Sequence, residues 1–359
     1  MAKDLMAAKT DAVWSAHGTT PDAIEAALRQ LLIERHAENE RFMPARVLNM
    51  IAFVDREWTG EIANRLRGVG RYHASRLIVF AYEPRRERLD ARVTIASEDD
   101  PDSGEIALLR ETVVVEIGDR HLDDLITIAD PLVVTDLPTL LWSPHGHDDV
   151  VEELLELSQA VLLDSVDEPV AREALDRVCA LTGRAYVVDL AWLRSTPWRE
   201  RVAGAFDPPR LRRELRTITS VQVRHHPDSP VTAMLLGGWL ASRLGWKPSR
   251  LVGEGPALVG KVHAERQDVT LRLEPAPEMT VRGLEGVTIE TASGRCLRLD
   301  RGPGGLHARA RDPRGDVHEW RIPGASRGET GILGEGIRQA LLRDPTYIPA
   351  VTAARAMVP

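Results

Sequence analysis

Hydrophobic and polar positions follow two different periods along this chain, and the change of period divides it into two halves. In the first half, short apolar runs alternate with stretches that place apolar residues every three or four positions. The runs predict buried strands at residues 46–54, 76–82, 139–142, 161–163 and 185–190. Strands that alternate with helices of about ten residues require parallel crossovers, so this half predicts an α/β domain whose mostly parallel sheet lies between flanking helices.

The same half holds shorter elements around these runs. Two further strands are expected at residues 91–97 and 112–117, on either side of an acidic turn. Helices are expected at residues 62–67, 122–129, 150–157 and 168–181. Ahead of them, Thr20-Pro21-Asp22 predicts the start of a helix, since a hydroxyl cap followed by proline is typical of that position. Residues 1–20 are polar and mixed, and we expect them to be mobile.

Period two dominates the second half, after one long helix marked by the stripe Val231, Leu235 and Trp239. Alternating segments then follow at residues 269–273, 279–281, 287–289, 297–299 and 318–322. Turns rich in Gly and Pro separate these segments, which predicts an antiparallel sheet. Helices at residues 332–342 and 348–357 close an expected α+β domain. The expected organisation is an extension with one helix at 1–42, an α/β domain at 43–190 and an α+β domain at 191–359.

Composition narrows the functional classes. A net charge of −8 argues against broad nucleic-acid binding, which needs a basic footprint. No apolar run approaches the ~18 residues of a membrane span, and the first residues lack the apolar core of a secretion signal. The two cysteines, Cys179 and Cys296, make neither a disulfide framework nor a metal cluster. We therefore expect a cytoplasmic protein without nucleic-acid or membrane partners.

The densest group of binding-type side chains lies where a predicted strand gives way to a predicted helix. Residues 192–201 hold two tryptophans and three arginines. Thr196-Pro197 predicts a helix that begins with a side-chain cap, and Asp207-Pro208-Pro209 predicts its end. Upstream, Asp189 is expected near the end of a strand.

Two interpretations fit this stretch. Trp198, Val202 and Phe206 share one helical stripe, so Trp198 and Phe206 can be core residues while the arginines are solvated or paired with Asp189. Alternatively, the stretch is a binding surface, because Arg and Trp are over-represented where proteins bind their partners.

Three separated motifs carry a family resemblance. The first is Asp189-Leu-Ala-Trp192-Leu-Arg194-Ser-Thr-Pro-Trp198-Arg199, followed by a short helix and Phe206-Asp-Pro. The second is Arg71-Tyr-His73-Ala-Ser75-Arg76 with the apolar run after it, and the third is Leu236-Gly-Gly-Trp239-Leu-Ala-Ser-Arg243-Leu-Gly245. In this order they resemble the motifs of the glucose-6-phosphate dehydrogenase assembly proteins, the OpcA family. The resemblance runs from about Arg46 to about Leu342, and Ala74 stands where the family's second motif has proline.

The resemblance implies a non-catalytic factor that binds glucose-6-phosphate dehydrogenase and promotes its active oligomer. Such an effector acts through a higher affinity for one state of the enzyme, whose population then rises. The partner-binding residues that it implies are Asp189, Trp192, Arg194, Trp198 and Arg199, followed by Arg71, His73 and Arg76. It implies no cofactor and no metal. Some family members respond to thioredoxin, but this chain lacks a Cys-x-x-Cys pair, and we treat both cysteines as small buried residues.

Other patterns have a chemical and a structural interpretation. Gly255 to Lys261 has the spacing of a phosphate-binding loop, but Val262 replaces the required Ser or Thr, which favours the start of a strand. The segment His145-Gly-His147-Asp148-Asp149 offers metal ligands, although its aspartates also suit the first turn of a helix. His225 and His226 point to opposite faces of a strand, so a shared metal is disfavoured.

A small-molecule site remains the alternative function. Sites in α/β proteins lie at the carboxyl ends of the strands, and Arg71 and Arg76 could there clamp a sugar phosphate. The protein would then be a regulator or an enzyme, although no Ser-His-Asp order and no dinucleotide fingerprint stands out.

Overall fold

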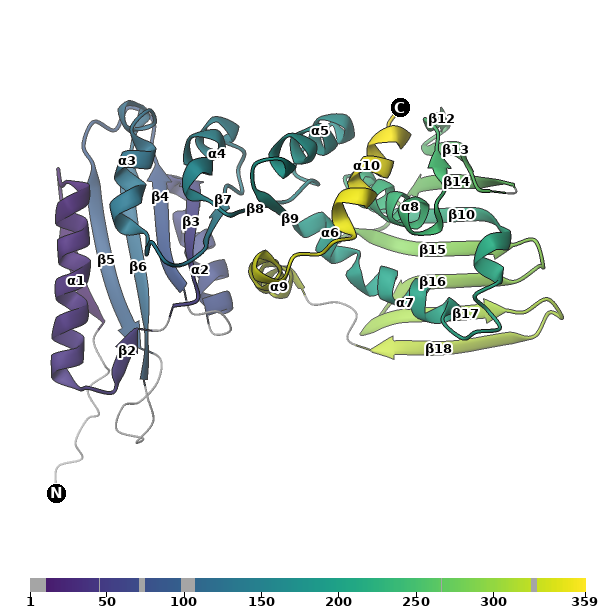
Figure 1. Ribbon diagram of the computed structural model, residues 1–359, viewed down its shortest axis with the longest axis horizontal. Helices are drawn as coiled ribbons and strands as arrows, with labels where there is room; N and C mark the ends of the chain where they lie inside the picture. Colours follow the sequence, from purple (N-terminus) through teal and green to yellow (C-terminus); the bar gives the residue numbers. More distant parts are fainter. Residues whose placement is uncertain (1–10, 45, 71–74, 98–106, 266, 324–327) are drawn as a thin grey trace, which may run out of the picture. The chain divides into compact units, whose positions relative to one another are not determined.

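The computed structural model describes residues 11–44, 46–70, 75–97, 107–265, 267–323 and 328–359 (Figure 1). The chain divides into two compact units, Met1–Leu163 and Asp164–Pro359. The division expected from the sequence, with a boundary after residue 190, stays a prediction about domain organisation. In its coarse form the expected fold class is confirmed, because the chain combines helices with two mixed sheets.

The first unit is built on a sheet with strand order β1-β5-β6-β4-β3-β7-β8, and β2 lies beside β6. Its strands are β1 (Ala12–Ala16), β2 (Phe42–Pro44), β3 (Leu48–Asp55), β4 (Ser75–Tyr82), β5 (Asp90–Ser97), β6 (Ala107–Ile117), β7 (Thr139–Trp142) and β8 (Ala160–Leu163). The neighbours from β6 through β4, β3 and β7 to β8 are parallel, whereas β5 is antiparallel to both β1 and β6. The central strand β3 is buried from Leu48 to Val54, as expected for a parallel strand covered on both faces.

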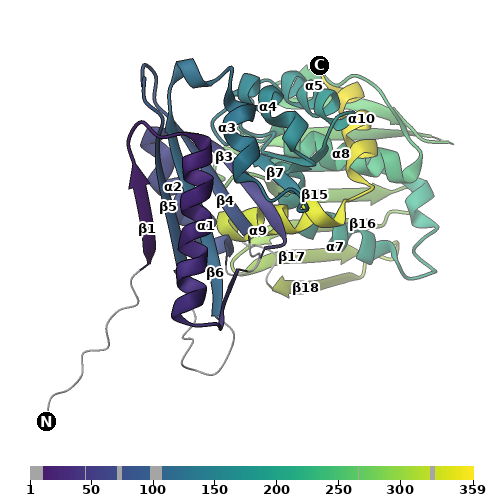
Figure 2. The ribbon, with the colours of Figure 1, turned by 60° about the vertical axis from the view of Figure 1, so that its left-hand side comes forward.

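The α-helices in the described part of this unit are α1 (Pro21–Glu38), α2 (Thr59–Gly70), α3 (Leu125–Ala129) and α4 (Asp148–Leu154). The hydroxyl of Thr20 accepts a hydrogen bond from the backbone N–H of Ala23 at the start of α1, which confirms the predicted cap. Ile24 and Leu28 are buried where α1 packs against β5 and beside α3 (Figure 2). Helix α2 follows β3 and contacts β3 and β4.

The second unit contains β9 (Tyr186–Asp189) and a sheet with strand order β11-β13-β14-β10-β15-β16-β17-β18, in which β12 lies beside β13. The strands of this sheet are β10 (Ile218–His225), β11 (Lys247–Pro248), β12 (Val252–Glu254), β13 (Ala257–His263), β14 (Asp268–Pro275), β15 (Leu284–Thr291), β16 (Cys296–Gly302), β17 (Gly305–Arg311) and β18 (Val317–Pro323). Its neighbours are antiparallel, apart from the parallel pair β10/β14. Side chains alternate across the sheet, so Val221, Leu271 and Ile289 lie on a buried face and Gln222 and Arg272 lie on the opposite face.

The helices of the second unit are α5 (Ala171–Thr182), α6 (Leu190–Arg194), α7 (Thr196–Phe206), α8 (Pro230–Leu244), α9 (Gly328–Leu342) and α10 (Tyr347–Met357). Helix α8 contacts β10 and β14, and α10 packs on α8 (Figure 1). The two helices approach closely at Gly238, where a Cβ atom would lie 2.2 Å from the carbonyl oxygen of Ala350. The third motif therefore needs a glycine at this position. None of the helices in the described ranges has the length and hydropathy needed to cross a lipid bilayer.

Three expectations about elements were wrong. Residues 12–16 form strand β1 rather than a mobile segment, because Trp14 pairs with Val93 at the end of the sheet; residues 1–10 lie outside the described part. Residues 279–281 form no strand, since a turn closed by the bond from the Met279 N–H to the Ala276 carbonyl leads from β14 to β15. Strand β17 was not predicted, because its inward positions at 306, 308 and 310 include two alanines and give a weak apolar alternation.

Candidate functional site

Asp189 ends β9, as its place at the end of an apolar run predicted, and it also caps α6, a helix that was not predicted. Its carboxylate accepts hydrogen bonds from the N–H of Ala191 (2.9 Å), from the N–H and hydroxyl of Ser165 (3.1 and 2.7 Å) and from the hydroxyl of Tyr347 (2.9 Å). The side chain is buried, and burial raises the pKa of this carboxyl in spite of these donors. Asp189 thus ties three segments of the second unit together: β9, the turn at Ser165 and α10.

Near Asp189, the buried side chains of Trp192 and Arg199 stack on each other and both contact the half-buried Asp344. The guanidinium carbon of Arg199 lies 3.5 Å from the ring centroid of Trp192, and the indole N–H of Trp192 donates to Asp344 Oδ2 at 2.8 Å. Arg199 Nη1 lies 3.5 Å from the same oxygen. Burial lowers the pKa of Arg199 to about 10, although Asp344 opposes the shift. A cation held between an aromatic face and a carboxylate fixes the corner between α9 and α10, which contains Asp344.

The start of α7 differs from the predicted cap. Ser195 occupies the N-cap position with helical backbone angles and makes no side-chain cap bond. The hydroxyl of Thr196 instead accepts from Arg199 Nη2 at 2.8 Å, and that of Ser195 accepts from Arg199 Nε at 3.1 Å. Both hydroxyls therefore help to hold the arginine over Trp192.

Trp198 and Arg194 complete the stretch; Trp198 is buried, and the side chain of Arg194 is 8% exposed. Trp198 is 1% exposed and shares its stripe with Val202 and Phe206, which confirms the core interpretation of these residues. Arg194 pairs with Asp164, at 2.7 Å from Nη1 to Oδ2, rather than with Asp189. Burial raises the pKa of Asp164 to about 6, and Arg194 offsets part of that shift. The structure brings these side chains together with Asp189, Trp192 and Arg199 below the surface of the second unit, and their partner-binding role stays a prediction.

The second predicted group is described only in part, because Arg71 and His73 lie outside the described residues. Arg76 lies in β4 and is buried. Its Nε donates to Glu111 Oε2 at 2.7 Å, and its Nη1 donates to the carbonyl of Leu132 at 2.9 Å. Arg46 also pairs with Glu111, so one buried carboxylate joins two arginines inside the first unit.

A second polar cluster lies at the carboxyl ends of the parallel strands of the first unit. Asp55 ends β3, and its Oδ1 lies 2.9 Å from Nε2 of His147, which follows β7. The rings of Tyr82, at the end of β4, and His147 lie 5.6 Å apart. A hydrogen bond from the Tyr82 hydroxyl to Asp119, with burial, raises the pKa of Tyr82 to about 12. Polar residues directly after parallel strands are the sequence signal that could have identified Asp55, Tyr82 and Asp119.

Two of the histidines singled out in the sequence, His147 and His225, lie at the ends of elements. Asp148 and Asp149 lie in the first turn of α4, as predicted, but the expected aspartate cap is wrong: His147 occupies the N-cap position with left-handed angles (φ 58°) and makes no side-chain cap bond. His225 ends β10 and is buried. Among the described residues, no group of three or more His, Cys, Asp or Glu side chains is arranged to hold a metal ion. Gly260 and Lys261 lie within β13, which confirms a strand at the phosphate-loop-like motif.

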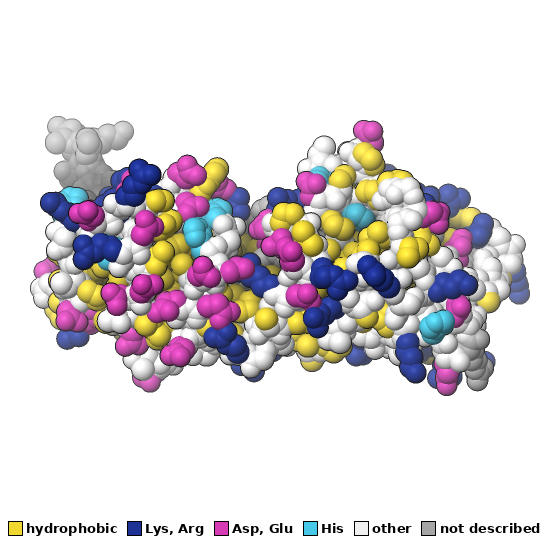
Figure 3. All heavy atoms as spheres, turned by 90° about the horizontal axis from the view of Figure 1, so that it is seen from above, with side chains coloured by type: hydrophobic (Ala, Val, Ile, Leu, Met, Phe, Trp, Pro, Cys, Tyr) yellow, Lys and Arg dark blue, Asp and Glu magenta, His cyan; other side chains and the backbone are white. Residues whose placement is uncertain are grey.

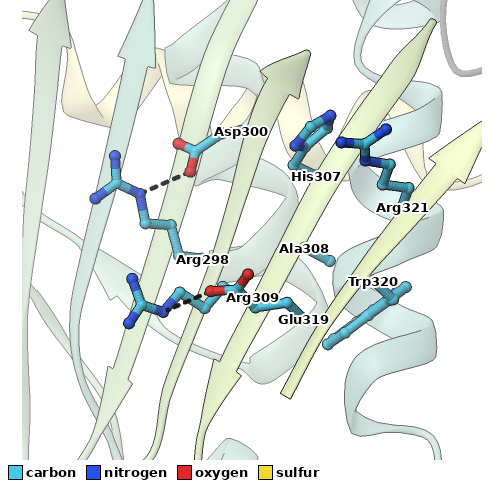
Figure 4. Close-up of a pocket in the computed structure, with 8 residues that line it drawn as sticks. All are labelled: Arg298, Asp300, His307, Ala308, Arg309, Glu319, Trp320 and Arg321. Atoms are coloured by element: carbon cyan, nitrogen blue, oxygen red, sulfur yellow. Dashed lines mark hydrogen bonds and ion pairs between the residues drawn. The ribbon is translucent and has the colours of Figure 1, made fainter. Parts of the chain in front are cut away.

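Two surface hollows lie in the second unit. One, of about 540 Å³, lies over β16, β17 and β18, where the ion pairs Arg298–Asp300 and Arg309–Glu319 line it beside Arg321 (Figure 4). The other, of about 590 Å³, is lined by the end of α7, by residues that follow this helix and by residues of β16, β17 and β18, including Trp320. Neither hollow lies at the carboxyl ends of the strands of the first unit. Over the face shown in Figure 3, acidic, basic and apolar side chains are interspersed.

Both cysteines are free thiols and half-buried. Burial raises the pKa of each thiol, which disfavours the reactive thiolate.

Solved structures with a similar arrangement of elements are oxidoreductases, at low similarity. An NAD-binding oxidoreductase from Klebsiella pneumoniae has a TM-score of 0.49 and 10% sequence identity, over 86% of this chain and 94% of that chain. The apo scyllo-inositol dehydrogenase from Lactobacillus casei has a TM-score of 0.46 and 12% identity, over 88% and 96%. Likeness at this level carries no argument about activity.

Sequence comparisons give a specific result. OxPP cycle proteins named OpcA are 29% identical over 150 residues in Synechococcus elongatus and 32% identical over 142 residues in Nostoc punctiforme. These alignments cover 40% and 38% of this chain, and 34% and 30% of the relatives. The chain therefore matches about a third of the length of these curated relatives.

Two family models match consecutive parts of the chain. The model described as the glucose-6-phosphate dehydrogenase subunit N-terminal domain matches residues 67–180, and the corresponding C-terminal domain model matches residues 185–351. The second match contains the whole stretch from Asp189 to Arg199. The chain belongs to the OpcA family of glucose-6-phosphate dehydrogenase assembly proteins.

Proposed function

We propose that this protein is a non-catalytic assembly factor that binds glucose-6-phosphate dehydrogenase and promotes its active oligomer in the oxidative pentose phosphate pathway. The observation that carries the proposal is the pair of matching family models, both described as domains of a glucose-6-phosphate dehydrogenase subunit. The factor binds one state of the enzyme more tightly and so raises its population. Two free thiols suit the reducing cytoplasm, which is the compartment we propose.

In this proposal, the residues of the first motif do not contact the dehydrogenase. They hold in place the residues of this protein that form the surface for the dehydrogenase. Asp189, Trp192, Arg194, Trp198 and Arg199 are all buried, so their side chains act as positioning groups. Trp192 and Arg199 hold Asp344, and Asp344 fixes the exposed corner between α9 and α10. A change at Trp192 therefore alters the surface at this corner without removing a direct contact.

The test combines enzyme kinetics with a measurement of oligomer size. Dehydrogenase from the same organism is assayed with and without this protein, and its oligomer is followed by size-exclusion chromatography with light scattering. We expect a lower KM or a higher kcat, together with co-elution and a larger active oligomer. An enzyme whose KM, kcat and size are all unaffected would overturn the proposed function.

Trp192→Phe tests the positioning role with a matched control. This variant keeps an aromatic ring under Arg199 and loses the 2.8 Å bond to Asp344. The control is Trp239→Phe in α8, because the indole N–H of Trp239 has no hydrogen-bond acceptor among the described residues. We expect Trp192→Phe to weaken the effect on the dehydrogenase about threefold to tenfold, as the net loss of one hydrogen bond of about 1 kcal/mol allows, and the control to keep it. Equal activation by both variants, at equal thermal stability, would remove Trp192 from the proposed role.

A sugar-phosphate-binding regulator or enzyme is the second candidate, and the cluster at Asp55, Tyr82 and His147 favours it. These side chains come from neighbouring parallel strands and their carboxyl ends, where ligands of α/β proteins bind. Calorimetric titration with glucose 6-phosphate tests it, with Asp55→Asn as the variant expected to weaken binding. If neither the wild type nor Asp55→Asn shows a heat of binding with glucose 6-phosphate, the assembly factor is the sole remaining candidate.

A further inference from the structure

The second sheet ends on a strand that has few of the usual protections of an edge. Among the described residues β18 pairs with β17 alone, in an uninterrupted register from Gly305↔Pro323 to Arg311↔Val317. Its other side presents a row of backbone N–H and C=O groups, to which another strand can bind. Proteins commonly protect such edges with short strands, charged side chains and above all lysine, proline or bulges.

The opposite edge of the same sheet has these protections. It consists of β11, a two-residue strand of Lys247 and Pro248, and of β12, which is three residues long. Strand β18 is seven residues long, contains no lysine, and has its one proline at its last position. Because the two edges of one sheet differ in this way, we expect another strand to bind along the β18 edge.

The side chains of β18 indicate what covers it. Glu319 and Arg321 are exposed on one face; Glu319 pairs with Arg309 at 3.3 Å, while Arg321 makes no ion pair with another described residue. The other face carries Trp320, half-buried and stacked on His318 with ring centroids 5.3 Å apart. Opposite charges therefore flank a central aromatic residue.

We propose that β18 pairs with β18 of a second copy of this chain, antiparallel and centred on Trp320. In this register, Glu319 lies opposite Arg321 of the second copy, and the reciprocal pair forms on the other side of the twofold axis. Trp320 lies opposite its own counterpart, which adds an aromatic pair on the other face. Opposite charges and aromatic pairs directly across two strands stabilise a sheet. The arrangement is self-complementary, as a twofold interface requires.

The dimer is weak, because one pair of seven-residue strands buries less surface than a standard stable interface of about 1,600 Å². Its formation therefore depends on concentration in the purified protein. The proposal does not rest on the proposed function, since it concerns two copies of this chain alone.

Cysteine trapping tests the register. In Trp320→Cys the new thiols lie directly opposite each other, with Cβ atoms about 5 Å apart, and mild oxidation links two copies. Val317→Cys is the matched control: in this register the two thiols lie roughly 20 Å apart at about 3.3 Å per residue, so they do not link. Peptide mass spectrometry assigns each link, so the native Cys179 and Cys296 remain in place. Absence of a link at 320, or equal linking at 317 and 320, would overturn the proposal.

Charge exchange tests the complementarity without cysteine. Glu319→Arg and Arg321→Glu each place like charges opposite each other, and we expect each to weaken dimerisation about tenfold or more in sedimentation velocity over a concentration series. The double variant restores opposite charges and recovers the dimer, while thermal unfolding checks that each variant is folded. Self-pairing is contradicted if the wild-type protein stays monomeric at every concentration. It is also contradicted if neither single change weakens the dimer. Linking of Trp320→Cys to the dehydrogenase alone would also overturn it, and would assign the edge to that partner.

Discussion

Asp164 directly follows β8 and Asp189 is the last residue of β9, and burial raises the pKa of both carboxyls. Asp164 reaches about 6 even though Arg194 donates to it at 2.8 Å. Desolvation raises the pKa of Asp164 more than the paired arginine lowers it. The negative charges of Asp167 and Asp189 nearby raise the pKa further. At the scale of single residues, the ionised form of Asp164 costs folding free energy near neutral pH.

The first prediction concerns the pH dependence of stability. A carboxyl with a higher pKa in the folded chain binds its proton more tightly there, so its contribution to the free energy of unfolding falls as pH rises from 3.8 to about 6. Asp164→Asn removes this titration. We expect the stability of the wild type relative to Asp164→Asn to fall by about 3 kcal/mol between pH 3.5 and pH 7, at about 1.4 kcal/mol per unit of pKa shift. Urea unfolding of both proteins at several pH values measures the difference.

A relative stability that rises over this range would show that Arg194 outweighs burial. Carbon NMR of the Asp164 carboxyl gives an independent reading, in which a midpoint near 6 is expected. A midpoint below the ordinary value of 3.8 would contradict the prediction.

Sequence patterns predicted the local features of this region but not its partners. The end of a strand at Asp189 and the buried stripe of Trp198, Val202 and Phe206 follow from the order of apolar and polar residues. The bonds of Asp189 to Ser165 and Tyr347 join residues 24 and 158 positions apart, and no periodicity encodes contacts over such separations.

Two helix glycines, one tightly packed and one not, allow the effect of close packing on stability to be distinguished from that of helix propensity. Gly238 lies in α8, where an added Cβ would meet the backbone of α10 at 2.2 Å, whereas Gly204 lies in α7 with no atom within 4 Å of such a Cβ. The two helix glycines therefore look alike in the sequence but differ at the scale of elements.

The second prediction is that alanine at these glycines has opposite effects. Gly238→Ala forces α8 and α10 apart and lowers the free energy of unfolding by about 2–3 kcal/mol, the usual cost of overpacking. Gly204→Ala raises it by about 0.5–1 kcal/mol, because alanine loses less backbone entropy in a helix. Thermal and urea unfolding measure both. Stabilisation by Gly238→Ala would show that the helices can separate at little cost.

Element prediction from the sequence succeeded where the apolar signal was strong. Strand β3 is apolar apart from Asn49 and its last residue, Asp55, and α1 has a cap and a stripe, so both were predicted within a few residues. Strand β17 was missed because alanines mark two of its inward positions. Strand β1 was missed because it is five residues long and gains its stability from pairing with β5.

At the scale of the whole molecule, each compact unit has its own buried apolar core. The core of the first unit includes Phe53 and Ile78, and that of the second includes Trp198 and Val223. The sequence predicted two halves from the change of period, but the place where one set of contacts ends and the other begins depends on tertiary packing.

The third prediction uses Gly238→Ala to ask whether these cores unfold separately. The strain lies between α8 and α10, both in Asp164–Pro359, so it raises the population of forms opened within that unit. We expect amide hydrogen exchange to speed up in α8, α10 and the strands β10 and β14 that α8 contacts, by about tenfold or more for a loss of 1.4 kcal/mol or more. Amides of β3 and β4 in Met1–Leu163 should exchange at the wild-type rate, and Gly204→Ala serves as the control that speeds neither set. Equal acceleration in β3 and β10 would mean that the chain opens as one cooperative body, in which case a partner that binds either unit stabilises both.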